Sequence, residues 1–267
     1  MSTPFDLFSV AGRTALVTGG ATGLGRIGAE ALLRAGARVL IASRKGEACV
    51  AAAKALSIFG PCEGFAGDVA SEAGVTALAA ELRQRTQRLD ILVNNAGVSW
   101  GERLETFPWK AWERVMMVNV AGLFTLTRDL LPLLQVGATP DRPSTIVNIG
   151  SIMGTVTQAE TAYSYAASKG AVHHLTRILA AEFAARQITV NAIAPGPFQT
   201  NMTQFALGAQ DGAMRAARSV PMGRLGRADD IAGALLFLTG RSGAYTSGAI
   251  IPVDGGQSAG ASASMFA

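Results

Sequence analysis

Cysteine is scarce in this chain of 267 residues. Cys49 and Cys62 are its two cysteines, and neither has a second cysteine or a histidine at the spacing of metal ligands. A scaffold built on several disulfides is therefore excluded. We expect reduced thiols, no bound metal ion and a cytoplasmic location.

Charged residues are also sparse, at 16% of the chain, with a formal net charge of +4. The densest basic cluster, residues 34–45, is spread over an expected helix, turn and strand, which suits a local anion site better than a nucleic-acid surface. No segment reaches the roughly 18 uninterrupted apolar residues of a membrane span, and residues 1–10 lack the basic start of a signal peptide. We expect neither a nucleic-acid partner nor a membrane location.

Hydrophobic residues, by contrast, make up 49% of the chain, and 31 glycines are spread along it. This length suits one dinucleotide-binding and catalytic domain over residues 1–267. Residues 195–227 are irregular and are expected to form a lid, whereas the small residues of the tail, 257–267, are expected to fray.

Short apolar runs alternate with stretches of helical period, which is typical of α/β proteins. Because the runs are apolar on consecutive residues, we expect helices on both faces of one Rossmann-type doubly wound parallel sheet of about seven strands. The expected strands are 14–18, 38–42, 63–67, 90–94, 145–149, 189–193 and 250–253. The expected helices are 25–35, 48–59, 72–85, 109–134, 165–186 and 229–238.

The first expected strand runs directly into GGATGLG and then a helix. A dinucleotide pyrophosphate needs glycines there, because the backbone must turn tightly and approach the phosphates at the helix N-terminus. Gly19, Gly23 and Gly25, with Thr22 and Leu24, are therefore candidate cofactor-binding residues. The alternative is a glycine turn that binds nothing.

The second expected strand ends at Ser43, followed by Arg44, where an acidic residue would hold the ribose hydroxyls of NAD. A guanidinium with a neighbouring hydroxyl suits a 2′-phosphate, whereas a carboxylate would repel it. The pair favours NADP, unless Arg44 is simply a solvated surface residue.

The chain resembles the short-chain dehydrogenase/reductase family, through TGGATGLG for TGxxxGxG, NNAG at 94–97 and YAASK for YxxxK. The likeness extends over essentially the whole chain. It implies that Asp68 and Val69 border the adenine. It also implies a group of residues along the rest of the cofactor: Asn95, Ala96, Gly97, Pro195, Gly196 and Thr200.

Each of these residues also has a structural reading. Asp68 could cap the next helix, Asn95 could stabilise the sheet, and Pro195 with Gly196 could be a turn at a strand end.

Ketone reduction needs a hydride donor and an acid for the developing alkoxide. Tyr165 is the candidate acid, and Lys169 lies one helical turn later on the same face, where its ammonium is expected to lower the phenol pKa and to hold the nicotinamide ribose. Tyr163 lies on another face of the helix and is assigned to packing or the substrate pocket.

Two further residues are expected to complete the catalytic group. Ser151 ends the fifth strand, where its hydroxyl can orient the substrate oxygen. Asn119 falls within a helix, and the family resemblance implies that it holds a water next to Lys169. His173 and His174 carry no family role and are assigned to packing or an interface, and Trp100 is a possible pocket residue.

Within the family, the strings DILVNNAGVSWG, LLPLL, VNIGS and PMGRLGRADDIA are most similar to bacterial NADPH-dependent 3-oxoacyl reductases, including the type associated with rhamnolipid synthesis. A 3-oxoacyl thioester substrate is expected. A carrier protein would need a basic patch, with candidates Arg103, Arg215, Arg218 and Arg224. The alternatives are a small or cyclic ketone, diketone, sugar or steroid, or a non-enzymatic NADP sensor or scaffold. We expect a homotetramer, or else a dimer.

Overall fold

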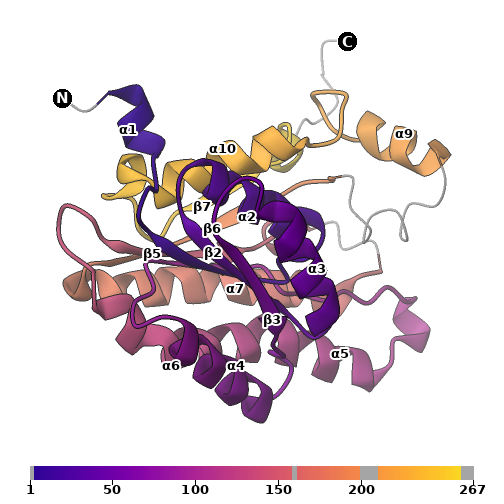
Figure 1. Ribbon diagram of the computed structural model, residues 1–267. Helices are drawn as coiled ribbons and strands as arrows, with labels where there is room; N and C mark the ends of the chain where they lie inside the picture. Colours follow the sequence, from indigo (N-terminus) through magenta and orange to yellow (C-terminus); the bar gives the residue numbers. More distant parts are fainter. Residues whose placement is uncertain (1–2, 158–160, 199–209, 260–267) are drawn as a thin grey trace.

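A sheet of seven parallel strands forms the centre of the computed structural model, which describes residues 3–157, 161–198 and 210–259 (Figure 1). The strand order is β3-β2-β1-β4-β5-β6-β7. In chain order the strands are β1 (Thr14–Thr18), β2 (Arg38–Ser43), β3 (Cys62–Ala66), β4 (Ile91–Asn94), β5 (Ser144–Ile149), β6 (Ile188–Pro195) and β7 (Ile250–Val253). The chain builds outward from β1 to β3 and then returns to β4 on the other side of β1, so the strand order reverses between β1 and β4.

Helices cover both faces of this sheet. One face carries α2 (Gly23–Arg34), α3 (Gly46–Leu56) and α10 (Ala228–Thr239). The other carries α4 (Glu72–Arg85), α6 (Leu123–Gln135) and α7 (Tyr163–Phe183), with α5 (Trp109–Met116) packed on α7. Two short helices, α1 (Pro4–Phe8) and α9 (Gln210–Arg218), lie near the ends of the described chain.

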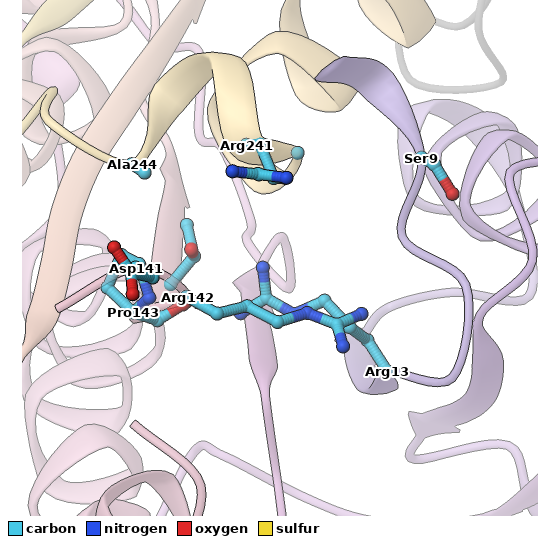
Figure 2. Close-up of a pocket in the computed structure, with 9 residues that line it drawn as sticks. Ser9, Arg13, Asp141, Arg142, Pro143, Arg241 and Ala244 are labelled. Carbon is cyan, nitrogen blue, oxygen red and sulfur yellow. The ribbon is translucent and has the colours of Figure 1, made fainter. Parts of the chain in front are cut away.

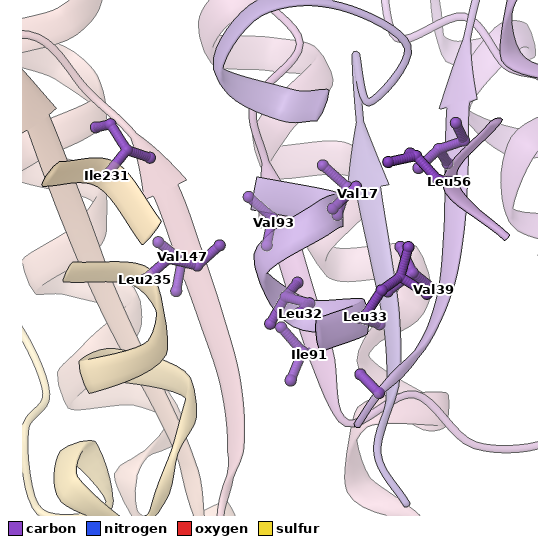
Figure 3. Close-up of a cluster of buried hydrophobic side chains, with 14 of the residues drawn as sticks. Val17, Leu32, Leu33, Val39, Leu56, Ile91, Val93, Val147, Ile231 and Leu235 are labelled. Atoms are coloured by element: carbon purple, nitrogen blue, oxygen red, sulfur yellow. The ribbon is translucent and has the colours of Figure 1, made fainter. Parts of the chain in front are cut away.

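Two apolar cores follow from the alternation of side chains along each strand. Val17 points into the core beneath α2 and α10, whereas its neighbour Leu16 points into the core beneath α4 and α6. The two strands next to β1, β2 and β4, repeat this pattern. Figure 3 shows the first core, where Leu32 and Leu33 of α2 face strand residues. Burying each such side chain contributes roughly 1.5–3 kcal/mol, so both faces of the sheet stabilise the fold.

The expected doubly wound fold is confirmed, and each expected strand begins within one residue of the observed strand. The continuous helix expected over 109–134 is wrong in one respect. A π-helical segment, η2 (Met117–Gly122), separates α5 from α6. The sequence did not predict α1, which Thr3 caps through a reciprocal pair of hydrogen bonds with Asp6.

Two expectations fall largely outside the described residues. The lid expected over 195–227 includes 199–209, and the tail expected over 257–267 includes 260–267. Within the described part, Phe198 is buried in the core beneath α2, and α9 follows at Gln210–Arg218.

The helical run Trp109–Gln135 is long and apolar enough, by length and composition, to cross a membrane. Half of its most apolar window is buried inside the structure. Because α6 packs on α4 and α5 packs on α7, this run is accounted for as a core helix of the fold.

Candidate functional site

The predicted cofactor residues gather at the carboxyl ends of the strands, around the point where the strand order reverses. Gly19, which follows β1, and Asn95, which follows β4, meet at this edge of the sheet. Open α/β sheets bind ligands in the crevice at such a reversal. The fold therefore places the glycine-rich turn where a dinucleotide can lie.

The glycine-rich turn requires glycine for its backbone conformation and for close packing. Gly19 and Gly23 have φ of +66° and +55°, a left-handed conformation that favours glycine. A Cβ on Gly19 would stand 2.8 Å from Asn95 Nδ2, and a Cβ on Gly25 would collide with that nitrogen and with the Gly19 carbonyl. The turn thus leaves a cradle that side chains would fill, next to the first turn of α2. Such a cradle fits a pyrophosphate.

Asn95 holds this turn in place. Its Nδ2 donates hydrogen bonds to the carbonyls of Thr18 at 2.8 Å and Gly19 at 3.2 Å, and its backbone N–H donates to Thr18 Oγ1 at 3.0 Å. The N–H of Ala96 donates to the same hydroxyl at 3.0 Å. Asn95 and Ala96 are therefore both fixed against the glycine-rich turn.

Two predicted residues lie within the turn or at the start of α2. Thr22 is the N-cap residue of α2, but its side chain makes no capping hydrogen bond. Leu24 packs against the core beneath α2.

Ser43 and Arg44 lie at the end of β2, beside the glycine turn. The Ser43 hydroxyl is 3.0 Å from the buried Cys49 thiol of α3. Arg44 is exposed and, among the described residues, has no hydrogen bond or ion pair assigned to it. A free guanidinium at this edge can bind a phosphate.

Asp68 and Val69 follow β3, at the outer end of the same edge. Asp68 Oδ1 accepts from the Ala70 N–H at 3.0 Å, while the N-cap of α4 is Ser71, whose hydroxyl accepts from Gly74 N–H at 3.2 Å. The alternative that Asp68 caps the following helix is therefore wrong. Val69 is buried.

Pro195 and Gly196 end β6 at this edge, and Thr200 lies outside the described residues. Pro195 is the last residue of the strand itself. Gly196 donates to the Val253 carbonyl at 3.0 Å, and a Cβ on it would stand 2.8 Å from the Asp254 backbone. Glycine is required there by close packing against the segment after β7.

The four predicted catalytic residues lie together beside the crevice. The Ser151 hydroxyl donates a hydrogen bond to the Tyr165 oxygen, and the Lys169 ammonium lies 5.4 Å from the Tyr165 ring centroid. Lys169 Nζ donates to the Ile149 carbonyl at 2.6 Å. A Cβ on Gly97 would stand 3.3 Å from Asn119 Oδ1 and 3.8 Å from Lys169 Nζ, so Gly97 keeps this space open.

Asn119 is buried in the π-helical segment, a feature that often marks functional sites. Its Oδ1 accepts from Val98 N–H, and its Nδ2 donates to the Val98 carbonyl and to Ser168 Oγ, each at 2.9 Å. Because the side chain is engaged by these partners, it anchors the segment after β4 to α7.

Ser168 is a member of this network that the sequence analysis missed. Its hydroxyl donates to the Tyr165 carbonyl at 2.7 Å while accepting from Asn119. Its position three residues after Tyr165 on the same helix could have indicated this side-chain to backbone hydrogen bond.

The pKa of Tyr165 is raised rather than lowered, contrary to the expectation from sequence. Burial raises it, and the hydrogen bond with Ser151 opposes that effect in part. Burial also lowers the pKa of Lys169 to about 8, because the ammonium has little water around it. At neutral pH the phenol therefore holds its proton, and most Lys169 side chains remain cationic.

A chain of buried side chains fixes the helix that carries Tyr165 and Lys169. Asn94 of β4 donates to Thr127 of α6 at 3.1 Å and to Asn148 of β5 at 2.9 Å. Asn148 in turn donates to Thr176 of α7 at 2.9 Å. The two helices are thereby held at a fixed spacing across two strands.

A hollow lies at the opposite, amino-terminal end of the strands, and Figure 2 shows its arginines. Arg13 is buried there and donates to the carbonyls of Thr239, Asp90 and Pro143 at 2.6, 2.8 and 2.7 Å. These bonds connect the end of α10 to the segments that precede β4 and β5. In the described part of the chain, no group of three or more His, Cys, Asp or Glu residues could hold a metal ion.

Comparison with known proteins places this geometry in a family. A family model described as enoyl-(acyl carrier protein) reductase matches residues 19–258. The rhamnolipids biosynthesis 3-oxoacyl-[acyl-carrier-protein] reductase of Pseudomonas aeruginosa is 47% identical over 93% of this chain and 97% of its own length. Galactitol 2-dehydrogenase (L-tagatose-forming) of Cereibacter sphaeroides is 39% identical over 94% of this chain and 96% of its own.

Solved structures agree. The Pseudomonas aeruginosa RhlG/NADP active-site complex superimposes with a TM-score of 0.92 at 46% identity, covering 95% of this chain and 99% of that one. A gluconate 5-dehydrogenase from Burkholderia cenocepacia, in complex with NADP and tartrate, has a TM-score of 0.88 at 31% identity, covering 96% and 99%. The chain therefore belongs to the short-chain dehydrogenase/reductase family of oxidoreductases.

Proposed function

We propose that this protein reduces the ketone of a 3-oxoacyl thioester to a secondary alcohol with NADPH. The observation that carries the chemistry is the juxtaposition of Tyr165, Lys169, Ser151 and Asn119 beside the glycine cradle. NADP is the cofactor, as it is in the similar RhlG complex, and when bound in reduced form it supplies a hydride.

The chain's own residues would bind the cofactor at five places. The cradle of Gly19, Thr22, Gly23, Leu24 and Gly25 would hold the pyrophosphate, with Ser43 and Arg44 on the 2′-phosphate. Asp68 and Val69 would border the adenine, and Asn95, Ala96 and Gly97 would line the middle. Pro195 and Gly196 would frame the nicotinamide, with Thr200 from beyond the described residues.

Tyr165 acts as the general acid. Its raised pKa keeps the phenol protonated at neutral pH, so the hydroxyl can give its proton to the ketone oxygen as that oxygen gains charge. Ser151, hydrogen-bonded to Tyr165, orients the same oxygen. Lys169 stabilises the phenolate that is left and holds the nicotinamide ribose, while Asn119 fixes the segment of Gly97 and Val98 against α7.

The proposal of an acyl substrate is supported by the 47% identical relative, whose name states a 3-oxoacyl-carrier-protein substrate. Arg103, Arg215 and Arg218 are exposed and could receive an acidic carrier. Arg224 of the expected basic patch is instead paired with Asp230, at 2.7 Å, which removes it from that role. Relatives that act on galactitol or gluconate favour a small polar ketone as the second candidate.

The test is oxidation of NADPH and NADH by purified protein with 3-oxoacyl thioesters, sugar ketones and cyclic ketones. We expect NADPH-selective turnover of the thioesters. Turnover confined to sugars or cyclic ketones would keep the chemistry and overturn the acyl substrate. No turnover with any pair, despite NADPH binding, would favour a sensor or scaffold.

Two variants test the assigned residues. Tyr165→Phe should lower kcat by about 10²-fold or more, with NADPH affinity retained. The matched control is Tyr163→Phe, because Tyr163 packs edge-on against Phe107, with ring centroids 5.4 Å apart, and phenylalanine keeps that contact. Arg44→Asp should shift preference toward NADH; unchanged preference would contradict the phosphate site.

We also propose a homotetramer in the cytoplasm, with residues 1–267 acting as one domain. Met117, Phe124 and Ile178 expose between 42% and 49% of their surface on the α5–α6 and α7 side, where a second copy can cover them. Sedimentation velocity of wild type and Phe124→Glu tests the assembly, and cell fractionation tests the location.

A further inference from the structure

His173 stands behind the catalytic pair on the same helix. Tyr165, Lys169 and His173 follow one another at intervals of four residues along α7, so they share one face. His173 is 4% exposed. The mechanism proposed above gives this buried side chain no task.

The imidazole touches both ends of the segment that carries Ser151. On one side, a Cβ on Gly150 would collide with His173 Nε2. On the other, a Cβ on Gly154 would stand 2.8 Å from His173 Cε1, and Thr155 Oγ1 lies 3.4 Å from Nδ1. Gly150 makes room for the flat ring, and Gly154 makes room for both the ring and the backbone of Lys169, which a Cβ there would meet at 2.7 Å. The ring forms part of the surface on which this segment rests.

The segment between these contacts is a compact turn. The Ser151 hydroxyl accepts from Met153 N–H at 3.2 Å, and the Ser151 carbonyl accepts from Gly154 N–H at 3.0 Å. Gly150 N–H donates to Ile193 O at 2.7 Å. Because these bonds make the turn move as a unit, a shift at Gly150 or Gly154 carries the Ser151 hydroxyl with it.

Packing alone does not explain a histidine at this position. Among the described residues, His173 Nε2 is buried without a hydrogen-bond partner, which an apolar side chain of similar size would avoid. Burial, with the nearby cations Lys169 and Arg177, lowers the pKa of the ring to about 4, so it is neutral at pH 7. A neutral, flat ring between two glycines is a spacer of defined thickness.

We propose that His173 is a positioning residue that sets the Ser151 hydroxyl through the Gly150 and Gly154 contacts. This inference rests on the proposed function, because it needs Ser151 to orient the ketone. A displacement of about 1 Å in a catalytic group can cost about 10²-fold in rate, so a small shift of the turn has a measurable effect.

The experiment compares kcat, KM and NADPH affinity for wild type, Ser151→Ala, His173→Ala and the double variant, with the ketone that wild type reduces. We expect Ser151→Ala and His173→Ala each to lower kcat about 10-fold or more, with NADPH affinity within about twofold of wild type. In the Ser151→Ala background, His173→Ala should cost less than about threefold, because the group that it positions is gone. The matched control is His174→Ala, an exposed neighbour, which should behave as wild type.

A steric exchange provides a second arm. Gly150→Ala places a methyl group where the ring of His173 lies, so it should lower kcat alone and restore part of the activity when combined with His173→Ala. This arm also serves if His173→Ala fails to fold, because Gly150→Ala keeps the ring and should likewise lose its effect in the Ser151→Ala background.

The outcomes separate the two proposals. If Ser151→Ala leaves kcat unchanged, the role of Ser151 in the proposed function is wrong. If Ser151→Ala lowers kcat but His173→Ala does not, or if the two losses multiply, His173 does not position Ser151. A parallel loss of NADPH affinity would also overturn the inference, since it would indicate general damage to the site.

Discussion

Arg13 offers a quantitative test of how the amino-terminal end of the sheet is held together. Its guanidinium is buried and donates to the carbonyls of Thr239, Asp90 and Pro143 at 2.6–2.8 Å. Arg13→Met keeps most of the apolar stem and removes all three hydrogen bonds. The change therefore isolates the hydrogen bonds from the packing.

The expected loss follows from two opposing quantities. A hydrogen bond from a charged group is worth about 1.5–3 kcal/mol, so three contribute about 5–9 kcal/mol. Against this, the pKa of Arg13 is lowered to about 10, mainly by burial and also by the nearby cations Arg142 and Arg88, although Asp90 opposes the shift. That shift corresponds to a cost of about 3 kcal/mol. The net loss in Arg13→Met should be about 2–6 kcal/mol.

The assay is urea unfolding, followed by tryptophan fluorescence and far-UV circular dichroism, with the slope m compared between variants. The matched control is Arg34→Met, which removes an exposed ion pair with Glu30 and should cost less than about 1 kcal/mol. Well below the transition, Arg13→Met should retain turnover, because the catalytic residues lie at the other end of the strands. Equal losses in the two variants, at unchanged m, would refute this reasoning.

Three further predictions concern the catalytic side. Asn119→Ala leaves the N–H and carbonyl of the half-buried Val98 without their partners, so urea unfolding should show a loss of about 1–3 kcal/mol and turnover should fall. A free energy of unfolding that changes by less than about 1 kcal/mol would contradict this. Because unfolded histidine binds a proton near pH 6.5 and folded His173 near 4, stability should fall as the pH drops through that window, by about 2 kcal/mol at pH 5. The extra loss should be absent in His173→Ala. Finally, kcat/KM for NADPH should decline above about pH 8 as Lys169 loses its proton, and a flat profile to pH 9.5 would argue against its cationic role.

Features that repeat along the sequence could be predicted from it. The strands could be read because helices cover both faces of the sheet and make their apolar residues consecutive. The glycine cradle could be placed because its position between a strand and a helix is local in sequence. Helix boundaries differ from the expected ones by up to three residues, as with α7, which begins at Tyr163 rather than Tyr165 and has no side-chain cap at its start.

Features that depend on contacts between distant segments could not be predicted. The π-helical segment arises where Asn119 bonds to Val98 and Ser168, neither of which its own helix reveals. The direction of the Tyr165 pKa was missed because burial competes with the effect of nearby groups, and burial is a property of the fold. No sequence motif marked His173, because the residues that it packs against are glycines, which leave room for its ring by having no side chain.

The buried chain from Thr127 through Asn94 and Asn148 to Thr176 has a consequence for how such an enzyme can change its substrate. A helix can slide over a sheet only in steps that exchange one set of contacts for another. Each such step here would leave the buried amides of Asn94 and Asn148 without hydrogen-bond partners. The helix bearing the reactive tyrosine and lysine is thus a fixed reference against which other parts move. Adaptation to acyl chains or polyols falls to the connections that follow the strands, which can lengthen or change composition without disturbing the proton donor.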